Sequence, residues 1–173
     1  MNKTIIAFFS RADENYFGGS LRYIEIGNTE VVAGKMKEMI DTDVFKIEMK
    51  TPYAKDYMTC INEAKEDLQA NRRPELVALP ESMEVYENVI LAYPNYWGTI
   101  PVAVMTFLES YDFSGKTILP LCTHEGSGMG NSEAYIRKIC PGAIVKNGLA
   151  ILGSRAAESE LLVETWLKEN ALL

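Results

Sequence analysis

Three short segments, each directly after an apolar run, hold the residues of this 173-residue chain that could bind a flat ligand. Glycine-rich backbone and hydroxyl groups suit a phosphate, whereas aromatic side chains can stack on a planar ring. The segments are Ser10-Arg11 resumed by Gly27-Asn28-Thr29, then Tyr93-Pro94-Asn95-Tyr96-Trp97-Gly98, and then Thr123-His124-Glu125-Gly126-Ser127-Gly128. A ligand with a phosphate at one end and an aromatic ring at the other would satisfy all of them, and flavin mononucleotide (FMN) is such a ligand.

The first segment is the candidate phosphate site. Gly27-Asn28-Thr29-Glu30 leads straight into a helix-period pattern, so unpaired backbone N–H groups and the positive end of the helix dipole would face an anion. Ser10 and Thr29 would add hydroxyl donors. The alternative is that Asn28 or Thr29 only caps the helix. Residues 13–26 look inserted here, as a surface excursion or as a flap over the ligand.

The other two segments are the candidate ring site. Tyr96 and Trp97 stand beside Gly98 in a turn, where they could stack on the ring or merely cover a core edge. Backbone N–H groups from residues 123–130 could cap the pyrimidine edge. Neutral donors stabilise a reduced, anionic flavin less than a cation would, which predicts a low redox potential. Glu125 would disfavour that anion further if it pointed inward.

His124 is the only histidine in the chain and is a weak candidate for proton transfer, with a structural role as the alternative.

The three cysteines, Cys60, Cys122 and Cys140, match no metal or disulfide spacing, which favours a reducing cytoplasm and predicts no metal. The net charge of -7 argues against nucleic acid and suits transient docking on basic partner proteins. No apolar run is long enough to insert in a membrane.

Apolar runs that predict strands alternate with helix-period segments, which indicates an α/β fold. We expect one domain over residues 1–173: a three-layer sandwich with a five-stranded parallel sheet, order 2-1-3-4-5, and helices on both faces. Pro120 fits poorly inside its strand because it cannot donate to a ladder, and Pro101 should open a helix. The predicted strands are 5–9, 45–49, 89–93, 117–122 and 143–145 resuming at 149–151; the predicted helices lie around 32–40, 57–68, 101–108, 131–139 and 162–167.

These motifs, in this order, resemble the flavodoxin-like FMN-binding flavoproteins, specifically the bacterial branch with an Arg-Ala-Asp-Glu-Asn-Tyr segment, here Arg11 to Tyr16. The resemblance extends over nearly the whole chain. It implies non-covalent FMN, with phosphate contacts at Ser10, Arg11, Asn28 and Thr29, and ring contacts at Pro94, Asn95, Tyr96, Trp97, Gly98, Thr123, His124, Glu125, Gly126, Ser127 and Gly128. Two residues depart from the pattern: Tyr96 replaces a common tryptophan, and Glu125 replaces a common glycine.

Three functions remain open. The first is a low-potential carrier that passes electrons between redox partner proteins. The second is an enzyme, an FMN oxidoreductase that takes hydride from NADH or NADPH and reduces a quinone-like acceptor. The third, a signalling receiver domain, is disfavoured because it needs an aspartate at the end of a central strand, where Ser10 and Tyr93 stand. The sequence does not indicate the oligomeric state.

Overall fold

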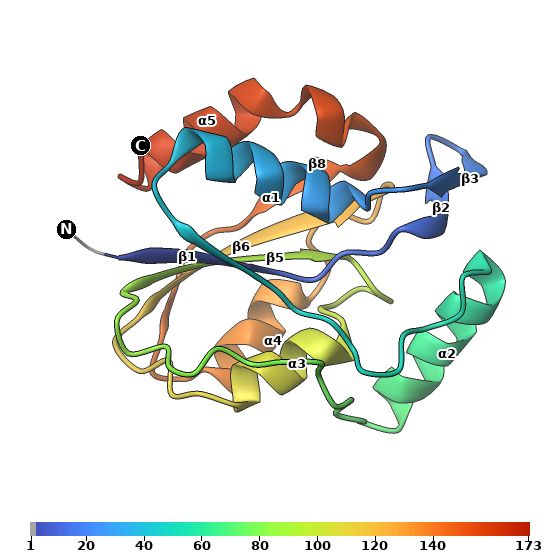
Figure 1. Cartoon of the computed structure of the whole chain (residues 1–173), viewed down its shortest axis with the longest axis horizontal. Coiled ribbons are helices and arrows are strands. Elements are labelled where there is room, and N and C mark those ends of the chain that lie inside the picture. The colour runs from blue at the N-terminus through green and yellow to red at the C-terminus, as the bar shows by residue number, and fades with distance from the viewer. Residues whose placement is uncertain (1–2) are drawn as a thin grey trace.

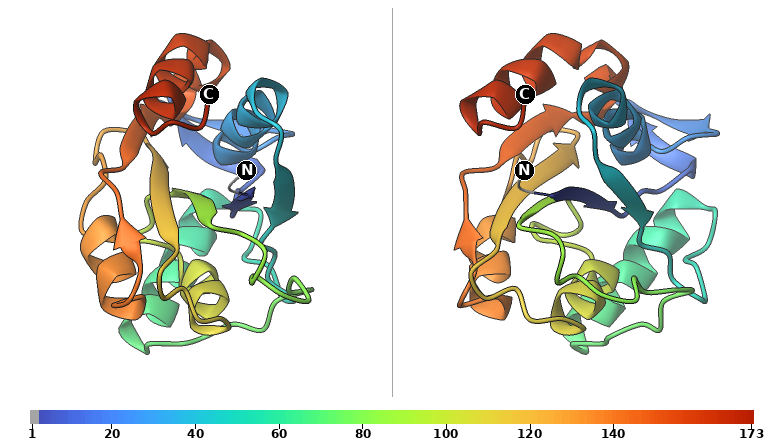
Figure 2. Two further views of the ribbon diagram at one scale, coloured as in Figure 1. Left: turned by 90° about the vertical axis from the view of Figure 1, so that its left-hand side faces the viewer. Right: turned by 60° about the vertical axis from the view of Figure 1, so that its left-hand side comes forward.

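The computed structural model describes residues 3–173, and its centre is a parallel sheet between two layers of helices (Figures 1 and 2). The predicted α/β class is therefore confirmed. The strands are β1 Thr4–Phe8, β2 Asp13–Phe17, β3 Ser20–Ile24, β4 Asp43–Lys46, β5 Asn88–Pro94, β6 Thr117–His124, β7 Ile144–Val145 and β8 Leu149–Leu152; the helices are α1 Asn28–Met39, α2 Tyr57–Gln69, α3 Val102–Glu109, α4 Ser132–Ile139, η1 Gly153–Glu158 and α5 Glu160–Glu169.

The main sheet has the order β4-β1-β5-β6-β7, with β8 also paired to β6. Counting β7 and β8 as two pieces of one strand gives the predicted order 2-1-3-4-5, although the sheet contains six strands. All its pairings are parallel. Because parallel strands end on the same edge, the loops after β1, β5 and β6 meet there.

Both faces of β1 are buried, which explains why the run from Ile5 of β1 to Phe9 just after it is apolar throughout. Ile5, Ala7 and Phe9 enter the core beneath α3 and α4, whereas Ile6 and Phe8 enter the core beneath α1 and α5. Strand β4 lies at the sheet edge as predicted, although it ends at Lys46 rather than continuing to Met49.

Pro120 lies inside β6 without breaking the sheet. Its neighbour across the ladder on one side is Leu91 of β5. On the other side β6 pairs with β7 only at residues 117–118 and with β8 only at residues 121–124, so no ladder bond is needed at Pro120. The split of the last strand thus accommodates the proline.

The segment 13–26 contains an antiparallel hairpin, β2–β3, which the sequence did not predict as strands. It stands apart from the main sheet, above α2 (Figure 1). The short helix η1 was also not predicted. Pro101 immediately precedes α3 rather than occupying its first turn.

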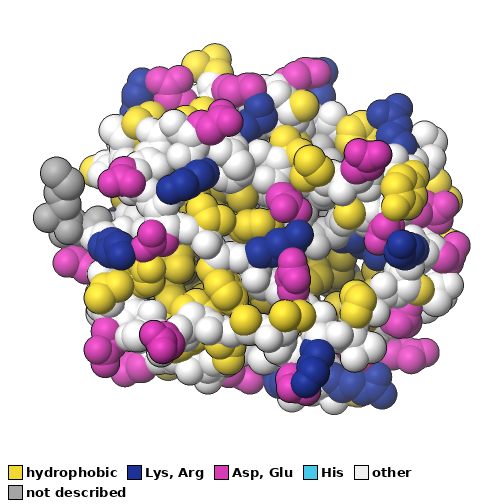
Figure 3. Space-filling view, viewed as in Figure 1, with side chains coloured by type: hydrophobic (Ala, Val, Ile, Leu, Met, Phe, Trp, Pro, Cys, Tyr) yellow, Lys and Arg dark blue, Asp and Glu magenta, His cyan; other side chains and the backbone are white. Residues whose placement is uncertain are grey.

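The described residues contain no helix that is long and apolar enough to span a membrane. On the face shown in Figure 3, basic and acidic side chains are interspersed, so this face has no continuous basic patch.

Candidate functional site

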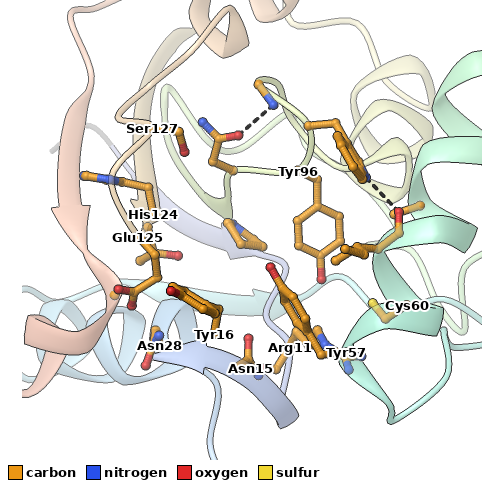
Figure 4. Close-up of a pocket in the computed structure, with 18 residues that line it drawn as sticks. Arg11, Asn15, Tyr16, Asn28, Tyr57, Cys60, Tyr96, His124, Glu125 and Ser127 are labelled. Carbon is orange, nitrogen blue, oxygen red and sulfur yellow. Dashed lines mark hydrogen bonds between the residues drawn. The ribbon is translucent and has the colours of Figure 1, made fainter. Parts of the chain in front are cut away.

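A cleft of about 530 Å³ opens where the loops after β1, β5 and β6 meet. This is the edge of the sheet at which doubly wound folds bind ligands. Figure 4 shows Asn28, His124 and Glu125 at one end of the cleft, and Tyr57, Cys60 and Tyr96 towards the other. Most of the predicted site residues line it: Arg11, Asn28, Pro94, Asn95, Tyr96, Trp97, Gly98, Thr123, His124, Glu125 and Ser127.

Four predicted residues, Ser10, Thr29, Gly126 and Gly128, are not among the residues that line the cleft. The Ser10 hydroxyl oxygen accepts the N–H of Glu30 at 3.0 Å, so Ser10 caps the first turn of α1. The buried Thr29 hydroxyl bonds to the Thr123 hydroxyl at 2.7 Å. These two residues therefore fix α1 against the ends of β1 and β6.

Gly27 allows the start of α1 to close on the end of β1. A Cβ atom at this position would lie 2.1 Å from the Ser10 hydroxyl and 2.6 Å from the Arg11 carbonyl oxygen, so no side chain fits. The N–H groups of Asn28 and Thr29 begin the helix and have no acceptor within it. This end of the cleft can therefore hold a phosphate by backbone N–H groups and the Asn28 side chain.

Arg11 acts as a clamp between segments. Its Nη1 donates to the Ala54 carbonyl at 2.9 Å, and its Nη2 donates to the carbonyls of Lys55 at 2.7 Å and Glu14 at 3.1 Å. The guanidinium thus joins the end of β1 to the hairpin and to the loop before α2. Its Nη groups are engaged by the chain, although the sequence had assigned Arg11 to the phosphate.

The loop after β5 is held in one conformation by Asn95. The Asn95 side chain accepts the Gly98 N–H at 2.8 Å and donates to the Gly128 carbonyl at 2.9 Å, while its backbone N–H donates to the Thr123 carbonyl at 2.8 Å. These bonds tie the two predicted ring loops together. Asn95 therefore shapes the ring site, with both ends of its amide already bonded.

Trp97 joins this loop to α2. Its backbone has φ of 55°, in the left-handed region that a tryptophan rarely adopts. The Trp97 indole is 48% exposed and donates its Nε1–H to the Ile61 carbonyl at 2.8 Å (Figure 4). The strained backbone thus places a flat, accessible aromatic side chain at the cleft.

Two side chains, His124 and Glu125, hold the loop after β6 in its conformation. His124 Nδ1 accepts the Gly126 N–H at 2.9 Å, so neutral His124 carries its proton on Nε2. The Glu125 carboxylate accepts the N–H of Ser154 at 2.8 Å and of Gly18 at 3.3 Å. Glu125 therefore lies toward the Asn28 end of the cleft and links this loop to the hairpin turn.

Seven cleft residues are not among the predicted site residues: Asn15, Tyr16, Tyr57, Cys60, Ile61, Ala64 and Gly153. Asn15 and Tyr16 belong to the segment 13–26, for which the sequence left a flap over the ligand as one alternative. The rings of Tyr16 and Tyr57 lie 6.3 Å apart and join the hairpin to α2. The only signal for the α2 residues was their helical spacing, which marks an apolar face but does not say whether that face covers the core or a cleft.

All three cysteines are buried, and burial raises the pKa of each thiol. For Cys122 the value rises to about 12 and for Cys140 to about 11. At Cys60 the nearby Arg11 charge opposes part of the rise. Residues 3–173 contain no group of three or more His, Cys, Asp or Glu side chains arranged to hold a metal ion.

The family model described as flavodoxin matches residues 19–170. No curated protein matches the chain with significant similarity.

Solved structures share the fold at low sequence identity. A protein from Bacteroides eggerthii, provisionally named a flavoprotein, is 24% identical over 100% of both chains, with a TM-score of 0.79. A flavoprotein from Lactobacillus acidophilus, solved in complex with FMN, is 17% identical over 91% of this chain and 98% of its own, with a TM-score of 0.65. An NADH:FMN oxidoreductase in its apo form is 16% identical over 97% and 86%, with a TM-score of 0.53.

Proposed function

Because this chain belongs to the flavodoxin family, we propose that it binds FMN non-covalently in the cleft and transfers electrons as a low-potential carrier in the cytoplasm. The family match and the neighbour solved with FMN both support this cofactor. The observation that carries the proposal is a single cleft with a backbone N–H cradle at one end and Trp97 on an ordered loop. Bound FMN would supply the redox chemistry, while the protein sets its binding, orientation and potential.

The charges that line the cleft are consistent with a low potential. Arg11 is the only lysine or arginine among the lining residues, and its Nη groups donate to carbonyl oxygens of the chain. Glu125 adds a carboxylate to the same cleft. Because Arg11 and Glu125 carry opposite charges, the lining adds no net positive charge that would stabilise a reduced, anionic ring, so reduction should be unfavourable compared with free FMN.

The second candidate is an FMN oxidoreductase that uses NADH or NADPH. It is favoured by the extension of the cleft past Tyr96 to Cys60, Ile61 and Ala64 of α2. That extension gives space for a small substrate beside a ring held by the 94–98 loop. The acidic net charge of -7 favours the carrier, because it suits docking on a basic protein partner.

The test is the anaerobic absorbance spectrum of the FMN-loaded protein after mixing with NADH or NADPH. A carrier should keep its oxidised flavin band, and gradual chemical reduction should yield a semiquinone. Rapid bleaching by either nicotinamide would establish the reductase instead. Failure to load FMN would contradict both functions.

A further inference from the structure

A carboxylate lies at the end of the cleft that is the candidate phosphate site. Glu125 lines the cleft, and Figure 4 shows its carboxylate next to Asn28, the first residue of α1. Gly153 borders both side chains, since a Cβ atom at this glycine would be 3.0 Å from Glu125 Oε1 and 2.5 Å from Asn28 Nδ2. The acidic group is therefore beside the residue whose N–H and side chain would hold a phosphate.

Hydrogen bonds to two other segments hold this carboxylate in place. Its Oε1 accepts the N–H of Ser154 at 2.8 Å, and its Oε2 accepts the N–H of Gly18 at 3.3 Å. Each carboxylate oxygen can accept a second hydrogen bond. The charge of Glu125 also acts across the cleft, because it adds to the rise in the pKa of the Tyr57 hydroxyl that burial mainly causes. Glu125 is thus a fixed negative charge in the cleft.

Of the described residues that line the cleft, none places a positive charge at the Asn28 end. Arg11 is the only lysine or arginine among them, and Figure 4 shows it beside Tyr57 rather than Asn28. Its Nη groups also donate to three carbonyl oxygens of the chain. In η1, Arg155 is exposed and pairs with Glu158 at 3.1 Å. The Glu125 charge is therefore not neutralised at the phosphate end.

The other charged or titratable side chains on the elements around Glu125 have partners of their own. They are His124, whose Nδ1 accepts the Gly126 N–H, Glu30 paired with Lys46, Asp13 bonded to the Tyr23 hydroxyl, Glu14 bonded to the Tyr57 N–H, and Arg22 over the Phe17 ring. Histidine is the side chain among these that gains a proton most readily near neutral pH. A test of any pH effect at Glu125 must therefore separate it from His124.

A phosphate at the Asn28 end would meet two opposing influences. The start of α1 provides N–H donors and about half a positive charge, whereas Glu125 provides a full negative charge. A phosphate ester has its second pKa at about 6 in water, so most of it is doubly charged at neutral pH. A like charge nearby raises the pKa of an acid, because it disfavours the more negative form. These surroundings favour a phosphate that carries one negative charge.

We propose that Glu125 makes the cleft select FMN with a singly charged phosphate, so that binding takes up a proton above about pH 6. The proposal rests on the proposed binding of FMN and specifies the ionisation state that this site accepts. A phosphate that keeps its last proton has an O–H donor for the Glu125 carboxylate, whereas the dianion has none. FMN therefore binds more tightly as the pH falls, and riboflavin, which has no phosphate, does not.

The ³¹P NMR spectrum of the FMN-loaded protein measures this ionisation state directly, because the chemical shift of the phosphorus changes when the phosphate loses its second proton. For the wild type, the midpoint of the ³¹P titration should lie at least about one pH unit above that of free FMN. Glu125→Gln keeps an acceptor for the Ser154 N–H and removes the charge, so its midpoint should fall to that of free FMN or below. A wild-type midpoint at or below that of free FMN, or an unchanged midpoint in Glu125→Gln, would overturn the proposal.

Two further variants show which side chain is responsible. Glu133→Gln removes another carboxylate that accepts a backbone N–H, that of Gly148 at 3.0 Å, but Glu133 does not line the cleft. The midpoint should therefore stay raised in this control. His124→Asn removes the only imidazole of the chain and should also keep the raised midpoint. If His124→Asn lowers the midpoint and Glu125→Gln does not, the proposal is wrong.

Ligand titrations measure the consequence for affinity. The dissociation constant of the wild type for FMN should be about fivefold lower at about pH 5.5 than at about pH 7.5, whereas that for riboflavin should change by less than about twofold. Glu125→Gln should lose most of the pH dependence for FMN. Riboflavin affinity close to that of the wild type would show that the ring site of this variant is intact.

The outcomes also separate this inference from the proposed function. If the wild type loads FMN and the bound phosphate is doubly charged at neutral pH, the selection by Glu125 is wrong while FMN binding stands. If the wild type fails to load FMN, the proposed function fails, and the selection of its phosphate fails with it.

Discussion

The two walls of the cleft are built differently. The wall formed by residues 94–98 and 123–128 follows two buried strands and is held largely by bonds to backbone atoms, such as Asn95 N–H to the Thr123 carbonyl and Asn131 N–H to the Gly98 carbonyl. The opposite wall, formed by the β2–β3 hairpin and α2, is joined to the cleft mainly by side chains. Arg11 reaches three carbonyls, Glu14 accepts the Tyr57 N–H at 3.0 Å, and Glu125 accepts the Gly18 N–H.

The two walls should therefore differ in how easily they move. The strand-end wall is fixed by the sheet itself, so it can hold a cofactor in one orientation. The hairpin–α2 wall depends on a few side-chain bonds at the surface, and local opening there should cost less than opening the sheet. We infer that the cofactor ring depends on the first wall, whereas access to the cleft depends on the second.

The largest expected effect follows from removing the clamp of the second wall. Arg11→Ala deletes three hydrogen bonds from a charged donor, so the free energy of unfolding should fall by about 2 to 4 kcal/mol. Denaturant unfolding measures this change, and hydrogen exchange should rise mainly in residues 13–24 and 54–57. The control is Arg137→Ala, which breaks an exposed pair with Glu133 and should cost well under 1 kcal/mol. Uniform exchange along the chain would show that the two walls are not separate.

The same difference explains what the sequence could predict. The strand-end loops were identified because their residues directly follow apolar runs. Since parallel strands end at the same edge of a sheet, these loops must lie close together. The α2 part of the opposite wall was missed because the helical spacing of Tyr57, Ile61 and Ala64 is the same whether that face covers a core or a cleft. For the hairpin, which lies within residues 13–26, the sequence left both a surface excursion and a flap over the ligand open. The partners of Ser10 and Thr29 could not be foreseen either, since they bond to residues up to 94 positions away.

Trp97 connects the two walls, and its truncation should test the ring site. Trp97→Ala removes the exposed ring and its bond to Ile61, so the dissociation constant for FMN should rise about tenfold. Trp97→Phe keeps an aromatic ring without the N–H donor and should give an intermediate loss. Fluorescence titration measures both. An unchanged affinity in Trp97→Ala would exclude this side chain from the ring site.

At the phosphate end of the cleft, variants of the neighbouring residues Asn28 and Thr29 should affect ligand binding differently. Asn28 lines the cleft, so Asn28→Ala should weaken FMN about fivefold and riboflavin less than twofold. Thr29 bonds to Thr123 and does not line the cleft, so Thr29→Val should weaken both ligands equally and lower the free energy of unfolding by about 1 to 2 kcal/mol. If Thr29→Val instead weakened FMN more than riboflavin, and Asn28→Ala weakened the two ligands equally, the phosphate would lie on the Thr29 hydroxyl.

The smallest expected effect concerns Glu125, whose carboxylate joins the loop after β6 to the hairpin turn and to η1 by accepting the N–H groups of Gly18 and Ser154. Glu125→Gln keeps an oxygen acceptor for the Ser154 N–H and removes the negative charge near Asn28. FMN affinity should therefore rise about twofold, and the redox midpoint potential should become less negative, since the reduced anion no longer faces a carboxylate. Riboflavin affinity measured in parallel separates the two effects, because only a phosphate should gain affinity from the lost charge. A gain of the same size for riboflavin would assign the effect of Glu125 to the ring, and an unchanged potential would assign it to the hairpin turn alone.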